Sequence, residues 1–184
     1  MASKFPSRNA SLQPPGDLWV FGYGSLMWRP GFDYAERSLA VLSGLSRRLC
    51  VYSFNHRGTP EKPGLVMGLA PGGRCKGIAY RVPGAEREKV HAYLTEREQI
   101  TKVYLERYRP VRLEDGRKVT ALAYLVDRNH RQYAGHLSRE KLLFFARQGA
   151  GRSGPCIEYV KATAAHLEEM GIPDAELTWL ASAL

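Results

Sequence analysis

Apolar residues are spaced like β-strands through the first two-thirds of the chain. Residues 17–24, DLWVFGYG, form a short apolar and aromatic run that ends in glycines, which predicts a buried strand leading into a tight turn. Residues 38–54 are rich in valine, leucine and aromatic side chains, as expected of one long strand or two. Two hairpins are also predicted, one pairing 65–70 with 76–82 around Pro71-Gly72-Gly73 and one pairing 104–113 with 117–126 around Glu114-Asp115-Gly116.

Helical spacing appears in the middle of the chain and dominates its end. Between residues 84 and 99, Val90, Tyr93 and Leu94 recur at helical spacing among charged residues, which predicts an amphipathic helix. Three more helices are expected: 138–148 behind a serine cap, 158–170 ending at Gly171, and a short one after Pro173 with Asp174 near its start. Strands followed by helices, without regular βα alternation, favour an α+β fold built as a small, mostly antiparallel barrel with flanking helices.

We expect one domain, preceded by a tail. A length of 184 residues with 44% hydrophobic and 24% charged content is typical of one globular domain. Residues 1–16 are polar and contain no apolar signal-peptide core, so they are interpreted as a flexible tail before a single domain at 17–184. No apolar run approaches the roughly 18–20 residues of a membrane span. The sequence therefore predicts a cytoplasmic protein without a membrane partner.

The chain is basic, with a net charge of +9 from 27 Lys and Arg against 18 Asp and Glu. Such a balance attracts anions, whether nucleic acid, anionic lipid or small acidic metabolites. The basic residues are scattered and form no block of five or six like charges, and no RNP-like pattern is present. A solvated basic surface and the steering of an anionic small-molecule substrate are both compatible with this, and nucleic acid is not expected as a partner.

Cysteine spacing argues against a metal or a disulfide framework. Cys50, Cys75 and Cys156 lie far apart without a CxxC pair. Buried thiols are therefore expected, and no metal site is predicted.

Four segments carry candidate chemistry. In FGYGSLMW, residues 21–28, two glycines permit a sharp turn whose backbone N–H groups can hold a carboxylate or an oxyanion, although an ordinary tight turn shares this pattern. The loop from His56 to Gly64 offers Arg57, whose guanidinium can grip a carboxylate. The glycine-rich segment 149–154 precedes Tyr159, whose hydroxyl can donate to a ligand.

The fourth segment is the end of the amphipathic helix. Glu98 lies four residues after Leu94 and eight after Val90, so it falls on the apolar stripe, whereas Glu96 falls off it and is expected to face solvent. A carboxylate held out of water has a raised pKa, which suits a general base near neutral pH.

The order of these segments resembles the ChaC-type, glutathione-specific γ-glutamylcyclotransferases. The family's YGSL(I/M)W loop is matched by residues 23–28, its HRG-x-P-x-x-PG loop by 56–64, its Tyr-Leu-x-x-Arg-Glu helix end by 93–98, and its (E/D)Y pair by Glu158-Tyr159. The resemblance covers roughly residues 17–159. The YGSL and Arg-Glu signals together are fairly specific, whereas either alone is not.

The resemblance implies a small mixed barrel with flanking helices, and the conversion of glutathione into 5-oxoproline and cysteinylglycine without metal or organic cofactor. Carried onto the matching positions, it implies that Glu98 is catalytic and that the turn holds the γ-glutamyl group. The expected substrate-binding residues are Tyr23, Gly24, Ser25, Leu26, Arg57 and Tyr159.

Two positions depart from the family pattern. Thr95 stands where members often have Asp, and Cys156 stands where Asn is common. A cyclotransferase for other γ-glutamyl amines or amino acids therefore remains an alternative to a glutathione-specific enzyme, and a non-catalytic anion- or RNA-binding module is a more distant one. The sequence leaves the oligomeric state open.

Overall fold

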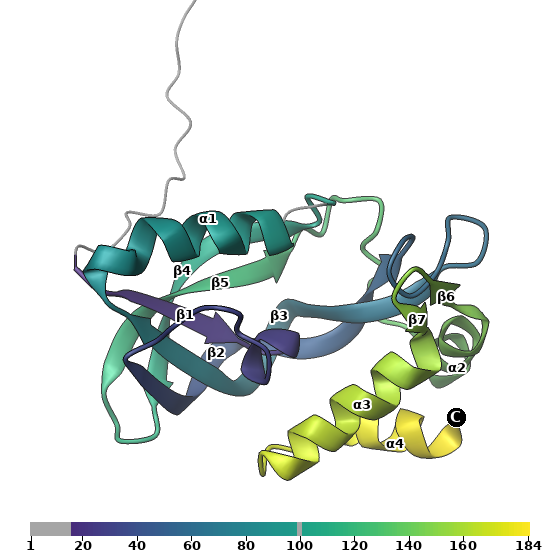
Figure 1. Ribbon diagram of the computed structural model, residues 1–184. Helices are drawn as coiled ribbons and strands as arrows, with labels where there is room; N and C mark the ends of the chain where they lie inside the picture. The colour runs from purple at the N-terminus through teal and green to yellow at the C-terminus, as the bar shows by residue number, and fades with distance from the viewer. Residues whose placement is uncertain (1–15, 99–100) are drawn as a thin grey trace, which may run out of the picture.

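Five strands form a closed barrel at the centre of the structure, a computed structural model that describes residues 16–98 and 101–184. The strands are β1 (Leu18–Gly22), β2 (Glu36–Ser53), β3 (Gly64–Val82), β4 (Tyr104–Leu113) and β5 (Lys118–Val126), arranged in the order β1-β3-β2-β4-β5 (Figure 1). Neighbours pair antiparallel except β1 and β5, which close the barrel in parallel. The α+β barrel predicted from the sequence is thus confirmed, and the predicted tail lies outside the described residues apart from Gly16.

The longest strand pair contradicts one predicted hairpin. Residues 38–53 of the predicted segment 38–54 lie in the single strand β2. The segments 65–70 and 76–82 belong to one strand, β3, which pairs with β2 along its length. Pro71-Gly72-Gly73 is a bulge within this pair, where the register moves from Leu45↔Pro71 to Ser43↔Arg74. Gly72 and Gly73 have positive φ angles of 100° and 75°, which a bulge requires as much as a turn does. The true hairpin connection between β2 and β3 is the polar loop of residues 54–63.

The predicted hairpin of β4 and β5 and the predicted helices are present. They are α1 (Arg87–Glu98, behind the 3₁₀ turn η2, Gly84–Glu86), α2 (Arg139–Gln148), α3 (Cys156–Glu169) and α4 (Ala175–Ala183). Ser138 and Asp174 cap α2 and α4 by accepting hydrogen bonds from backbone N–H groups. The predicted helix end at Gln99 lies outside the described residues. A short hairpin, β6 (Ala150–Gly151) and β7 (Gly154–Pro155), joins α2 to α3.

Two apolar clusters position the helices. Val90 and Leu94 of α1 pack with Leu18, Val20 and Leu122, so α1 lies along one side of the barrel (Figure 1). The larger cluster joins the barrel to α2, α3 and α4. Burying a Val or Leu side chain contributes about 1.5–3 kcal/mol, so α1 is firmly docked and the position of its last residue, Glu98, is fixed. Among the described helices, none has both the length and the apolar content needed to cross a bilayer.

Candidate active site

Two buried side chains, Arg47 and Tyr80, form hydrogen bonds to the carbonyls of the glycine-containing turn after β1. The chain leaves β1 at Gly22 and forms a 3₁₀ turn, η1 (Ser25–Met27). Arg47 donates from Nε to the Tyr23 carbonyl at 2.5 Å and from Nη2 to the Lys76 carbonyl at 2.6 Å. The Tyr80 hydroxyl lies 3.0 Å from the Leu26 carbonyl and 2.7 Å from that of Met27. The backbone carbonyls of Tyr23, Leu26 and Met27 therefore already have hydrogen-bond donors within the protein.

The same turn has open space beside Gly24. The hydrogen bonds inside the turn are donated by Met27, Trp28 and Arg29, and none of them comes from Gly24, Ser25 or Leu26. A Cβ built on Gly24 would meet nothing within 4 Å. Backbone donors beside open space are what a bound carboxylate or oxyanion needs.

Glu98 is mostly withdrawn from water, as its place on the apolar stripe predicted. Its side chain is 19% exposed, whereas Glu96 on the same helix is exposed. Burial raises the pKa of the Glu98 carboxyl, and the positive charge of Arg97, whose Nε lies 3.3 Å from Oε1, opposes this only in part. The carboxyl is thus prepared to exchange a proton closer to neutral pH than an exposed glutamate.

Arg97 ties the end of α1 to the glycine turn. Its Nη2 donates to Ser25 Oγ at 3.0 Å, and its Nη1 donates to the Arg29 carbonyl at 2.6 Å and to the Tyr93 hydroxyl at 2.9 Å. From the sequence, Arg97 was identified only as part of the Tyr-Leu-x-x-Arg-Glu motif, and no role in the site was predicted for it. These contacts, which only the folded structure reveals, hold the end of α1 and Glu98 beside the turn.

Three tyrosines interact electrostatically with Glu98: Tyr23, which is buried, and Tyr104 and Tyr159, which are partly buried. Burial is the main cause that raises the pKa of Tyr23, Tyr104 and Tyr159, and the negative charge of Glu98 contributes in each case. Tyr104 donates to the Met67 carbonyl at 2.7 Å, and the Tyr159 hydroxyl accepts from the Met67 N–H at 3.1 Å. All three hydroxyls stay protonated at neutral pH. Tyr104 was missed by sequence reasoning because only its position across the barrel from Met67, not a motif, distinguishes it.

Arg57 packs over the ring of Tyr159. Its guanidinium carbon stands 5.4 Å from the centre of the Tyr159 ring, and its Nη1 donates to the Pro155 carbonyl at 3.2 Å. The structure therefore brings together residues from four separate segments, namely the turn, Glu98, Arg57 and Tyr159. Leu26 contributes only backbone to this site, because its side chain is buried under α1.

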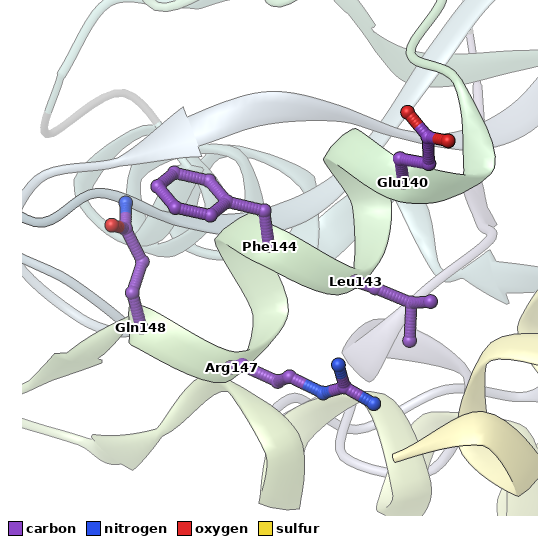
Figure 2. Close-up of a pocket in the computed structure, with 5 residues that line it drawn as sticks. All are labelled: Glu140, Leu143, Phe144, Arg147 and Gln148. Carbon is purple, nitrogen blue, oxygen red and sulfur yellow. The ribbon is translucent and has the colours of Figure 1, made fainter.

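Two hollows in the described part of the chain are lined by other residues. Figure 2 shows one lined by side chains of α2: Glu140, Leu143, Phe144, Arg147 and Gln148. Arg147 and Gln148 are engaged with the carbonyls of Ala183 and Pro63, which leaves one acidic group and an exposed phenyl ring. A second hollow, between β2, β4 and Ile172, is lined by neither the glycine turn nor Tyr23, Tyr104 or Tyr159. In the described part of the chain, no group of three or more His, Cys, Asp or Glu side chains is arranged to hold a metal ion.

Comparison with known proteins identifies the family of this chain. The family model described as "ChaC-like protein" matches residues 18–184. The chain belongs to the ChaC-like family. It is 33% identical over 159 residues to the glutathione-specific gamma-glutamylcyclotransferase of Escherichia coli (strain K12), covering 86% of this chain and 69% of that relative. It is 31% identical over 185 residues to glutathione-specific gamma-glutamylcyclotransferase 1 of Homo sapiens, covering 98% and 82%.

Solved structures show that the ChaC-like fold extends over nearly the whole described chain. The crystal structure of a γ-glutamyl cyclotransferase specific to glutathione from yeast superposes with a TM-score of 0.81 at 24% identity, covering 91% of this chain and 95% of that one. The four ChaC-like motifs found in the sequence are the segments that supply the turn, Arg57, Glu98 and Tyr159.

The two departures from the ChaC-like pattern are accommodated inside the fold. Thr95 donates to the His91 carbonyl at 3.0 Å and lies 3.3 Å from the Glu106 carboxylate. Cys156 is buried, and its thiol lies 3.3 Å from both the N–H and the carbonyl of Leu65. Both side chains are thus occupied by protein groups rather than directed at a ligand.

Proposed function

We propose that this protein is a γ-glutamylcyclotransferase that converts glutathione into 5-oxoproline and cysteinylglycine, with Glu98 as its acid/base residue. One observation carries the proposal: a carboxylate with a raised pKa is linked through Arg97 to a glycine turn whose outer N–H groups are open. The glutathione-specific relatives at 31–33% identity support the choice of substrate.

The reaction needs a proton acceptor and then a proton donor. The ammonium form of the γ-glutamyl α-amine cannot attack, and such an amine has a pKa of about 8 or higher, so Glu98 takes its proton. The amine nitrogen then bonds to the γ-carbonyl carbon and closes a five-membered ring. The bond from that carbon to the cysteine nitrogen breaks as Glu98 returns the first proton to the leaving amine. The ring nitrogen gives up a second proton, which also passes to that amine, so the products are the lactam N–H of 5-oxoproline and the ammonium group of cysteinylglycine. No nucleophilic side chain is consumed.

The turn and the tyrosines supply binding and polarity. The N–H groups of Gly24, Ser25 and Leu26 hold the γ-glutamyl group and stabilise the oxyanion, while Tyr23 and Tyr159 line the space beside Glu98. Since the attack is intramolecular, holding the substrate folded contributes much of the rate enhancement. Ser25 is a binding residue here, because its Oγ is engaged by Arg97 and no histidine base contacts it.

A reducing compartment suits this role. Cys50, Cys75 and Cys156 are all free and buried. Free thiols and a substrate that is itself a thiol support action in the cytoplasm.

The test is a single-residue replacement with a matched control. Wild-type protein incubated with glutathione is expected to release 5-oxoproline and cysteinylglycine, measured by mass spectrometry. Glu98→Gln removes the proton acceptor while keeping the shape, so turnover should fall by about 10²–10⁴-fold. Glu96→Gln changes the charge of the same helix at an exposed position and should leave turnover unchanged.

The outcomes separate the alternatives. Full activity in Glu98→Gln removes Glu98 from the mechanism. Release of 5-oxoproline from other γ-glutamyl amines or amino acids, but not from glutathione, favours the broader cyclotransferase. Absence of 5-oxoproline from all of them contradicts the proposed activity.

A further inference from the structure

Two loops bring three basic side chains together beside Tyr159. The β2–β3 loop and the β6–β7 hairpin are joined by backbone hydrogen bonds, from Arg152 N–H to the Asn55 carbonyl and from Ser153 N–H to the His56 carbonyl, each 2.9 Å long. This pairing places Arg152 Nη2 3.1 Å from His56 Nε2. Arg57, the next residue in the loop, stands over the Tyr159 ring. We call His56, Arg57 and Arg152 the basic cluster.

The two guanidinium groups of the basic cluster have no carboxylate partner. In residues 16–98 and 101–184, Arg81, Arg97 and Arg117 all form ion pairs, whereas Arg57 and Arg152 form none. A Cβ built on Gly154 would lie 3.2 Å from Glu158 Oε2 and 3.4 Å from Arg57 Nη1, so the Glu158 carboxylate is near Arg57, although the two form no ion pair. The positive charge of the cluster is therefore available to a ligand.

His56 holds Arg152 without adding a charge. An arginine only donates, so His56 Nε2 accepts from Arg152, and Nδ1 carries the proton that it shares with Ser153 Oγ at 2.9 Å. Burial, followed by the charges of Arg152 and Arg57, lowers the pKa of His56 and favours this neutral form. The fold thus directs Arg152 by a neutral contact and keeps its charge uncompensated.

The position of the basic cluster fits the far end of a γ-glutamyl dipeptide. In glutathione the terminal carboxylate is two residues beyond the bond that breaks, a reach of about 7 Å in an extended chain. Tyr159 is one of the residues proposed to bind the substrate, and the Arg57 guanidinium carbon is 5.4 Å from the centre of its ring. A γ-glutamyl peptide held beside Tyr159 can therefore direct its terminal carboxylate toward Arg57 and toward Arg152, which His56 holds on the adjoining loop.

We propose that Arg57 and Arg152 bind the C-terminal carboxylate of the substrate's peptide part and so select γ-glutamyl peptides over γ-glutamyl amines. The inference rests on the proposed function for the identity of the substrate. Guanidinium groups bind carboxylates in bidentate geometry, with donors that a neutral carboxamide does not satisfy equally. A γ-glutamyl amine has no such carboxylate to offer.

The experiment measures binding separately from turnover. The Glu98→Gln protein is titrated calorimetrically with glutathione and with glutathione amide, in which the glycyl carboxylate is a carboxamide. We expect glutathione to bind about 10-fold more tightly than the amide, as for a charge-assisted contact at a partly exposed site. Adding Arg152→Gln should remove that preference, because it weakens the binding of glutathione and leaves the binding of the amide unchanged. Arg152 is exposed, so this change leaves the core intact.

Two further variants sharpen the result. Arg128→Gln removes the same charge from another exposed position and should keep the preference for glutathione. Arg57→Lys keeps the charge but loses the planar fork, and should give an intermediate preference.

Failure of this inference differs from failure of the proposed function. Equal binding of glutathione and its amide, or equal weakening of both by Arg152→Gln, overturns the carboxylate site even when the wild-type protein produces 5-oxoproline. A carboxylate preference that depends on Arg152, in a protein that produces no 5-oxoproline, upholds the site and overturns the activity.

Discussion

At the scale of single residues, the candidate chemistry depends on the opposing effects of burial and charge on Glu98. Removing the carboxylate from water raises its pKa, while the adjacent guanidinium of Arg97 lowers it, and burial is the larger effect. Arg97 thus has two roles, because it also fixes the glycine turn. The two roles are separable by experiment, since one depends on charge and the other on hydrogen-bond geometry.

The pH dependence of kcat/KM tests the electrostatic role. Glu98 accepts a proton only when ionised, so activity should rise with pH along a limb whose midpoint lies above the 4.5 of an ordinary glutamate. Arg97→Gln removes the charge that favours ionisation and should move the midpoint further upward. Arg97→Lys retains the charge, so it should lower the rate through lost contacts while leaving the midpoint near that of the wild type.

The position of the midpoint is independent of the amount of active protein, which makes it a clean measurement. A limb at or below pH 4.5 in the wild type, or one that does not move in Arg97→Gln, would show that another group limits the rate. Thermal melting of each variant monitors folding.

At the scale of elements, two glycines in one turn serve different purposes. A Cβ at Gly22 would lie 3.0 Å from Leu26 Cβ, inside the protein. A Cβ at Gly24 would enter the open space where the γ-glutamyl group is proposed to bind. The first glycine therefore serves packing, and the second serves the ligand.

Alanine replacements should separate these purposes. Gly22→Ala is expected to cost about 1–3 kcal/mol of unfolding free energy through overpacking, seen as a lower Tm. Gly24→Ala should change Tm much less but raise the KM for glutathione or abolish turnover, because the methyl group occupies substrate space. A normal KM in Gly24→Ala would move the γ-glutamyl site away from the turn.

The elements also show what the sequence reveals and what it does not. Val90, Leu94 and Glu98 follow helical spacing, so α1 and the burial of its last residue were predictable from local periodicity. Pro71-Gly72-Gly73 was not, because glycines with positive φ serve turns and bulges alike, and only the pairing of β2 with β3 distinguishes them. Tyr104, Arg47 and Arg152 escaped notice for a related reason: their roles arise from contacts across the barrel or between loops.

At the scale of the whole molecule, the net charge of +9 creates a field that reaches beyond any single contact. Glutathione carries a net charge of −1 at neutral pH, with two carboxylates and one ammonium group, whereas its glycyl amide carries none. A positive protein attracts the first and is indifferent to the second at long range. Salt screens this attraction, with a Debye length of about 10 Å at 0.1 M.

The salt dependence of kcat/KM therefore distinguishes steering by the whole surface from local recognition. Between about 0.01 and 0.5 M NaCl, kcat/KM for glutathione should fall several-fold, whereas the value for glutathione amide should stay nearly constant. Arg128→Gln, which removes one exposed charge outside the basic cluster, should reduce the slope for glutathione slightly and leave its preference over the amide at high salt unchanged. Equal salt sensitivity for the two substrates would mean that the net charge does not guide the substrate, and that the scattered basic residues only keep the surface hydrated.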